Sequence, residues 1–369
     1  MLQMQTAHAI SDPLAVDNNK FGIHILFPDE LDKAATLINS NGGAWGYVTI
    51  PIQAGDKDIE KWQTFFNSAK QKRVIPLLRL ATEGDYFNTK VWRKPNEEDI
   101  LDFANFLNSL QWPTKNRYII VFNEVNRSDE WGGSTNPFEY ARLLGYAVDV
   151  FKEKNDDFFI ISSGMDNGAS TVLGQAYSQY SYYQLMAHEV PDIFEKIDGF
   201  SSHSYPNPAF SQPPSSYGYH SARSFSYERS TIGQFTKKRL PIFITEAGWS
   251  KNMVSEVTIA SYMKEAFFTI WTDPDIVAIT PFLLHAGSEP FAQFSFLAPD
   301  GSPNLLYRSI FELPKIQGKP KIEELTTKSI KKQNVNAPTK DFSKKRVQPI
   351  AVEIPLAFKN LAKWFFGIR

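Results

Sequence analysis

Two glutamates stand at the ends of two strongly apolar segments of the sequence, and a turn is predicted after each of them. Glu124 follows the apolar residues 118–122 within RYIIVFNEVNR, and Glu246 ends the apolar part of LPIFITEAGWS. Apolar runs of this length are typical of strands buried on both faces. Two carboxyl groups brought together at such strand ends can perform acid–base and nucleophilic chemistry. The fold must therefore bring the two strand ends to one place.

The elements that would position these glutamates alternate between strand and helix from about residue 20 to residue 314. The pattern predicts eight strands, at residues 21–26, 47–52, 74–80, 118–122, 158–162, 197–202, 241–245 and 276–283. Helices are predicted between them, at residues 29–39, 56–71, 96–110, 137–152, 182–196, 221–238 and 257–271. Eight such units indicate an α/β fold, a (β/α)8 TIM barrel. An open doubly wound sheet is the alternative, but no glycine-rich phosphate loop follows the first strand.

The carboxyl ends of barrel strands face one rim, where active sites lie. Polar residues occupy all eight predicted ends: His24, Gln53, Arg79, Asn123 with Glu124, Asp166 with Asn167, His203 with Tyr205, Glu246, and His285. Their convergence predicts a single site. Carboxyl groups on the fourth and seventh strands could lie about 5 to 5.5 Å apart, a separation suited to glycosidic bond cleavage with retention.

The two carboxyl groups would need different environments for this chemistry. Glu124 would have to hold a proton near neutral pH, which burial and nearby negative charge favour. Glu246 would have to stay ionised, so Arg79 and Tyr205 are predicted as its neighbours. A divalent metal bound by this pair with a histidine, His203 or His24, is the alternative. Since the histidines lack the spacing of a zinc motif, no metal or other cofactor is predicted.

Three motifs resemble glycoside hydrolase clan A, the retaining (β/α)8-barrel glycosidases, and their wording is nearest to families 39 and 17. These motifs are FNEVN on the fourth strand, SSHSYPNP on the sixth and ITEAGW on the seventh. The resemblance covers residues 20–314. It implies that Glu124 is the acid/base, that Glu246 is the nucleophile and that Asn123 holds the sugar 2-hydroxyl. His203 and Tyr205 match a His-x-Tyr motif whose tyrosine hydrogen-bonds the nucleophile.

Two departures from the clan pattern and two tryptophans bear on sugar recognition. The arginine of the clan often follows strand two, whereas Arg79 lies on strand three. The usual strand-eight tryptophan is replaced by ITPFLLHAG, so either Phe282 or His285 would form the floor of the −1 subsite. Trp131 and Trp249 follow the two glutamates and are candidates for stacking on sugar rings, with ordinary core packing as the alternative.

Composition narrows the remaining classes of function. The 369-residue chain has 42% hydrophobic and 14% aromatic residues, enough for a large core. A net charge of −1 makes nucleic acid a poor default partner. The absence of cysteine excludes disulfides and thiol catalysis. No uninterrupted apolar stretch is long enough for a transmembrane helix.

The two ends of the chain differ from the barrel. Residues 315–369 carry 13 Lys and Arg against 4 Asp and Glu, whereas residues 1–314 carry 26 against 36. A basic flexible linker is predicted at residues 315–349 and an amphipathic helix at residues 350–369, which either contacts an anionic membrane or docks on the barrel. In the N-terminal segment, residues 1–19, the sequence Ala7-His8-Ala9 matches a signal-peptide cleavage pattern. A signal that starts upstream and a chance match both remain open.

The sequence thus predicts a retaining hydrolase that cleaves β-linked oligo- or polysaccharides. A secreted or cell-surface location is predicted, with a cytoplasmic one still open. The alternative from another class is a carbohydrate-binding protein that has lost turnover, although binding alone does not require both glutamates. Sugar identity, linkage, endo or exo action and oligomeric state are not predicted.

Overall fold

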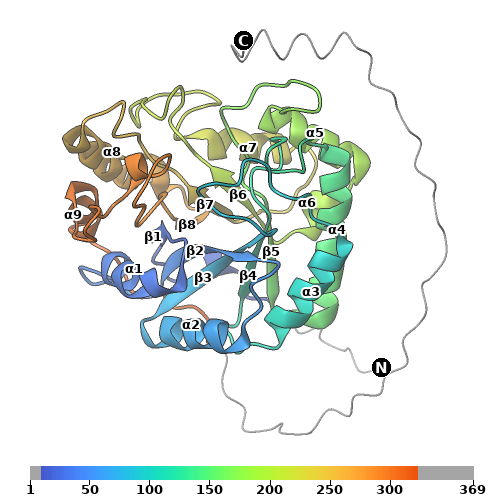
Figure 1. Ribbon diagram of the computed structural model, residues 1–369, viewed down its shortest axis with the longest axis horizontal. Coiled ribbons are helices and arrows are strands. Elements are labelled where there is room, and N and C mark those ends of the chain that lie inside the picture. The colour runs from blue at the N-terminus through green and yellow to red at the C-terminus, as the bar shows by residue number, and fades with distance from the viewer. Residues whose placement is uncertain (1–9, 323–369) are drawn as a thin grey trace, which may run out of the picture. The chain divides into compact units, whose positions relative to one another are not determined.

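Eight parallel strands form one sheet in the computed structural model, which describes residues 10–322 (Figure 1). They pair in sequence order as β1 (Gly22–His24), β2 (Gly46–Gln53), β3 (Val74–Ala81), β4 (Arg117–Val121), β5 (Phe158–Ser162), β6 (Gly199–His203), β7 (Ile242–Glu246) and β8 (Ile276–Ile279). A parallel bridge between Phe21 and Ile279 joins β8 back to β1. The predicted (β/α)8 barrel is therefore confirmed.

Helices surround the sheet on its outer side (Figure 1). They are α1 (Leu31–Ile38), α2 (Ile59–Gln71), α3 (Glu97–Asn108), α4 (Pro137–Lys154), α5 (Gln179–Glu189), α6 (Ile193–Lys196), α7 (Ser224–Ile232), α8 (Glu256–Phe268) and α9 (Leu305–Phe311). Short 3-10 turns occur at Pro13–Ala15, Pro28–Glu30, Ile270–Thr272 and Ala292–Phe294. Within residues 10–322, none of these helices is both long and apolar enough to cross a membrane.

Local sequence explains where several elements start and stop. Asn136 caps α4 by accepting hydrogen bonds from the first turn, and Pro137 occupies the first helical position, where it needs no donor. The single helix predicted at residues 182–196 is instead α5 followed by α6. Pro191 lies between them, because its ring and missing N–H interrupt a helix. The helix α9 was not predicted.

The end strands β1 and β8 are shorter than predicted. Beyond Ile279, the apolar residues Phe282 and Leu283 are buried but outside the strand, where they pack with Tyr205 and Phe294. The strand predicted at residues 276–283 is therefore confirmed only for residues 276–279.

Two apolar cores hold the barrel. The larger one lies between sheet and helices, and the smaller one fills the barrel interior. In the interior the Tyr118 ring lies 6.4 Å from that of Tyr47, 5.0 Å from Phe159 and 5.6 Å from Phe243, measured between centroids. Interior side chains from alternate strands make such a barrel a solid core, so that ligands bind at its rim.

Both ends of the described chain pack on the amino-terminal side of the barrel. Asn18 donates to the carbonyl of Val277 at the start of β8, and Ser11 exchanges hydrogen bonds with the Asn116 side chain before β4. Lys315 is 7% exposed, and its Nζ donates to the carbonyls of Ile310 and Leu313.

The prediction of a flexible linker from residue 315 onward is therefore wrong for residues 315–322. Gly318 donates its N–H to the carbonyl of Ala44, and Lys321 accepts from the N–H of Lys115. The signal-peptide remnant at residues 7–9, the rest of the linker and the helix at 350–369 lie outside the described residues. They stay predictions.

Candidate active site

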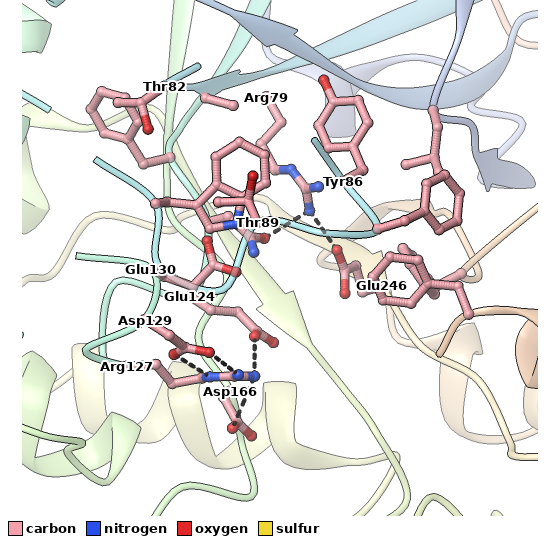
Figure 2. A pocket seen from close by; sticks show the side chains of 18 of the residues that line it. Arg79, Thr82, Tyr86, Thr89, Glu124, Arg127, Asp129, Glu130, Asp166 and Glu246 are labelled. Atoms are coloured by element: carbon pink, nitrogen blue, oxygen red, sulfur yellow. Dashed lines mark hydrogen bonds and ion pairs between the residues drawn. The ribbon is translucent and has the colours of Figure 1, made fainter. Parts of the chain in front are cut away.

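A pocket of about 360 Å³ opens where the carboxyl ends of the barrel strands meet (Figure 2). Its charged lining residues are Arg79, Lys90, Arg93, Glu124, Arg127, Asp129, Glu130, Asp166 and Glu246. Its aromatic lining residues are Tyr86, Phe87, Trp92, Phe122, Tyr205, Phe210, Phe282, Phe291 and Phe294. Of the residues at the predicted strand ends, six line this pocket together: Arg79, Asn123, Glu124, Asp166, Tyr205 and Glu246. A mixed aromatic and carboxylate surface suits a ligand with both apolar faces and many hydroxyl groups.

Glu246 is the last residue of β7 and is held by fixed donors. Arg79 Nη1 lies 2.5 Å from Oε1, and the Tyr205 hydroxyl donates to Oε2 at 2.9 Å. His203 Nδ1 is 3.7 Å from Oε2, and His24 Nε2 is 3.8 Å from Oε1. Burial alone would raise the pKa of Glu246, but the charges of His203 and Arg79 and the Tyr205 hydrogen bond outweigh it and lower the pKa. The predicted neighbours of Glu246 are confirmed, and they favour its ionised form.

Glu124 lies just beyond the last residue of β4, in a turn of unusual backbone geometry. Its backbone φ is +36° and that of Phe122 is +68°, values that residues other than glycine rarely adopt. The Glu124 N–H donates to the carbonyl of Gly164 at 2.9 Å. At Gly164 a Cβ atom would lie only 2.2 Å from the His203 ring, so that glycine is required there. The turn aims the Glu124 carboxyl group into the pocket (Figure 2).

The surroundings of Glu124 differ from those predicted. Arg127 Nη1 lies 2.9 Å from Oε2, and His203 Nδ1 lies 3.0 Å from Oε1. Burial raises the pKa of Glu124, but the His203 hydrogen bond and the charge of Arg127 outweigh it, and the pKa falls below its ordinary value. The sequence predicted that nearby negative charge would keep this residue protonated. That prediction is wrong for the arrangement seen here, because a cation contacts the carboxylate.

The two carboxyl groups lie close together. One oxygen of Glu124, one oxygen of Glu246 and a ring nitrogen of His203 are all within 4.8 Å of one another. Three such ligand atoms are the minimum for a metal site, but Arg79 and Arg127 already contact the two carboxylates. Two guanidinium charges at this distance oppose a bound cation, so the residues do not fit a metal.

The two predicted stacking tryptophans are both in the core. Trp131 is 1% exposed and packs between Phe122 and Tyr140. Trp249 is also 1% exposed, with its Nε1 donating to the carbonyl of Gln212 at 2.7 Å. Neither lines the pocket, so the prediction that they stack on sugar rings is wrong and the packing alternative holds.

The remaining predicted site residues fall into two groups. Asn123 and Phe282 line the pocket, and Asn123 Oδ1 accepts from Arg79 Nη1 at 2.7 Å. His24 is fully buried beneath the pocket, with its ring 5.1 Å from that of Phe282. His285 is partly buried and does not line the pocket, so that of the two candidates for the subsite floor only Phe282 lines it.

Sequence reasoning missed two groups of pocket residues. Arg127 directly follows FNEVN and Glu130 lies four positions after it. Charged residues so near a candidate catalytic carboxyl group could have been predicted as part of the site. Tyr86 and Trp92 lie in the long segment between β3 and α3, where an aromatic-rich loop after a barrel strand is itself a signal.

No protein-family model matches the chain, and no curated protein matches it either. Solved structures do. A family 39 glycoside hydrolase from Bacteroides cellulosilyticus WH2 shares 17% identity at a TM-score of 0.54, over 82% of this chain and 64% of that one. The chain thus spans just under two thirds of that protein.

Two further solved structures are similar. A glucosidase from Croceicoccus marinus shares 10% identity at a TM-score of 0.61, over 82% of this chain and 68% of that one. A subgroup II family 128 endo-β-1,3-glucanase from Pseudomonas viridiflava shares 14% identity at a TM-score of 0.51, over 81% and 99%. At such identities the similarity shows the fold. The fold is a (β/α)8 barrel, as the resemblance to clan A implied.

Proposed function

We propose that the chain is a retaining glycoside hydrolase that cleaves β-linked oligo- or polysaccharides. The observation that carries the proposal is the pair of buried carboxyl groups in the pocket, whose nearest oxygens lie within 4.8 Å. Retaining enzymes have their carboxyl groups about 5 to 5.5 Å apart, whereas inverting enzymes need about 6.5 to 9.5 Å to admit a water molecule. The spacing supports retention.

The surroundings of Glu246 suit a nucleophile. Arg79 and Tyr205 hold its carboxylate ionised, and Oε2 attacks the anomeric carbon as the bond to the leaving oxygen breaks. Glu124 gives its proton to that oxygen. Water then attacks the glycosyl ester, Glu124 takes a proton from the water, and Glu246 leaves as a carboxylate. No metal or cofactor takes part in these steps.

Substrate contacts follow from the pocket lining. Asn123, fixed by its hydrogen bond from Arg79, is placed to bind the sugar 2-hydroxyl. The faces of Tyr86 and Trp92 and the ring of Phe282 take the place of the two core tryptophans as apolar platforms.

The known ligands of similar structures support a β-linked glycan as the substrate class. One neighbour is described as an endo-β-1,3-glucanase, and another was solved in complex with Manβ1-4GlcNAc. Because these two differ in linkage, we propose the class and not one linkage.

A carbohydrate-binding protein without turnover is the second candidate. The similar fold and the aromatic pocket agree with it equally well. The ion pair of Glu246 with Arg79 argues against it, because a sugar hydroxyl can be bound without a permanently ionised carboxylate at the reaction centre.

Trapping the intermediate tests the proposal. A panel of aryl β-glycosides and β-linked oligosaccharides is assayed first, and the best substrate is converted to its 2-deoxy-2-fluoro analogue. Mass spectrometry should then find one sugar esterified to Glu246 in the wild type and none in Glu246→Gln. Binding of several panel sugars without hydrolysis or trapping would instead establish the binding protein.

A further inference from the structure

Arg127 is shared among three carboxylates at the rim of the pocket (Figure 2). Its Nη1 donates to Glu124 Oε2 at 2.9 Å, and its Nε and Nη2 contact both oxygens of Asp129 at 3.1 and 2.5 Å. Asp166 Oδ2 is 3.8 Å from Nη1. The Arg127 side chain is 37% exposed, so it has room to move.

Both oxygens of Glu124 are occupied in this arrangement. Oε1 faces His203 Nδ1, and Oε2 accepts from Arg127. A general acid carries its proton on an oxygen that faces the leaving group, and that oxygen cannot at the same time accept a short N–H bond along the same direction. Opening one of the two contacts would therefore favour the protonated form in which Glu124 acts as an acid.

Arg127 is the partner that can leave. His203 is 1% exposed, and its nearest other carboxylate oxygen is that of Glu246 at 3.7 Å, so its ring is fixed in place. Arg127 keeps two hydrogen bonds to Asp129 if it releases Glu124, and Asp166 stands ready to accept the freed Nη1. Releasing Glu124 thus costs Arg127 one of its three short contacts.

We propose that Arg127 is a positioning residue that alternates between Glu124 and the Asp129–Asp166 pair during turnover. This inference rests on the proposed function of Glu124 as acid/base. With Arg127 on Oε2, Glu124 is a carboxylate. A sugar in the leaving-group side of the pocket displaces the guanidinium toward Asp166. Glu124 then takes up a proton from solvent and gives it to the glycosidic oxygen. In the second half-reaction Glu124 receives a proton from the attacking water and releases it to solvent as Arg127 returns to Oε2, which restores the starting carboxylate.

The charges around Glu124 set the direction of the test. His203 from β6 contacts it, Glu246 from β7 and Arg79 from β3 line the same pocket, and Asp166 lines it from the loop after β5. Arg127, Asp129 and Glu130 belong to its own loop. Removing Arg127 deletes the nearest mobile cation and leaves the other groups in place. The proton on Glu124 should then be lost at higher pH.

The experiment compares pH profiles of kcat/KM in the full-length chain. With an aryl glycoside of poor leaving group, Arg127→Gln should move the alkaline limb to higher pH. Asp129→Asn removes the anchor that draws Arg127 away and should move the limb to lower pH. With a dinitrophenyl glycoside, which needs no protonation to leave, glycosylation should change little in either variant.

Arg93→Gln is the matched control, because Arg93 also lines the pocket and pairs with Glu83 and Asp99 but not with Glu124. It should leave the alkaline limb in place. An alkaline limb unmoved in Arg127→Gln, together with a lower Tm and equal losses on both substrates, would show a structural role and overturn the proposal.

A second readout separates failure of this inference from failure of the proposed function. The Glu124 carboxyl carbon is titrated by NMR in the wild type and in Arg127→Gln, with Glu124→Gln for assignment. A titration midpoint that rises in Arg127→Gln supports the contact without any turnover. A rise in a protein that hydrolyses no glycoside would leave the ion pair standing and refute the acid/base role. An unchanged midpoint in an active enzyme would refute the Arg127 inference alone.

Discussion

Glu124 and Glu246 look equivalent in the sequence, but the structure surrounds them differently. Glu246 belongs to the regular part of β7 and pairs with Arg79, whose side chain is 9% exposed. Glu124 lies in a turn at φ +36° and pairs with Arg127, whose side chain is 37% exposed. The partners of Glu246 are fixed by burial. One partner of Glu124 is free to exchange.

This contrast matches what the two proposed roles require. A nucleophile needs one charge state in the free enzyme, and buried donors provide it. An acid/base must gain and lose a proton within each cycle, so a permanent buried cation would hinder it. A loop-borne arginine with alternative carboxylate partners stabilises the ionised form without locking it. The following predictions test this difference.

The largest effect is expected for Glu246→Gln. No carboxylate remains to attack, and the amide leaves Arg79 without its charged partner, so kcat should fall by about 10⁴-fold to 10⁶-fold. Initial rates on the best aryl glycoside measure the loss. Glu228→Gln serves as control, since that carboxyl group is equally buried but bonded to Ser202 and Tyr183 behind the sheet. Equal losses in both variants would indicate a folding defect.

Glu124→Ala should have a smaller effect that depends on the leaving group. With a poor leaving group kcat/KM should fall by about 10² to 10⁴-fold, the usual contribution of a general acid, and with a dinitrophenyl group it should fall far less. Azide should raise the turnover of this variant by attacking the glycosyl ester in place of activated water. Azide rescue of Glu246→Gln and not of Glu124→Ala would show that the two roles are reversed.

The Glu246 side of the site could be predicted from sequence and the Glu124 side only in part. The carboxyl ends of parallel barrel strands all lie at one rim. The count of eight strands was therefore enough to predict that Arg79, Tyr205 and Glu246 lie close together. Loop side chains follow no such rule. Arg127 turns back because its N–H bonds to the carbonyl of Glu124, and Trp131 turns inward beside two glycines of positive φ.

A moderate effect is expected for Tyr205→Phe. The hydroxyl donates to Glu246 Oε2 at 2.9 Å, and a hydrogen bond to a charged group contributes about 1.5 to 3 kcal/mol, or roughly 10 to 150-fold in kcat/KM. Since this hydrogen bond lowers the pKa of Glu246, its loss should also move the acidic limb of the profile to higher pH.

Tyr183→Phe is the control for this variant, because Tyr183 donates to the buried Glu228 outside the pocket. An acidic limb that stays in place in Tyr205→Phe would mean that His203 and Arg79 keep Glu246 ionised without Tyr205. The fixed partners of Glu246 would then be fewer than proposed here.

An effect on stability, and not on catalysis, again separates the two sides of the site. Burial, and after it the charge of Glu124, raise the pKa of Glu130 to about 8, and no hydrogen bond or ion pair joins Glu130 to another residue of the described chain. The folded chain therefore holds this proton more tightly than the unfolded chain, whose value is 4.5. The stability from this group is present below pH 4.5 and is lost as pH rises to about 8.

Glu130→Gln should remove the loss of stability that this group causes between pH 4.5 and pH 8. Its Tm relative to the wild type should rise between pH 4.5 and pH 8 and level off above, whereas Glu98→Gln on the exposed face of α3 should show no such trend. Calorimetry across this range measures the difference. In Glu124→Gln the wild-type decline should itself be shallower, because the second cause of the raised pKa is gone. If the stability of Glu130→Gln falls with pH as much as that of the wild type, another group causes the fall. Glu130 would then not be one of the charges that act on Glu124.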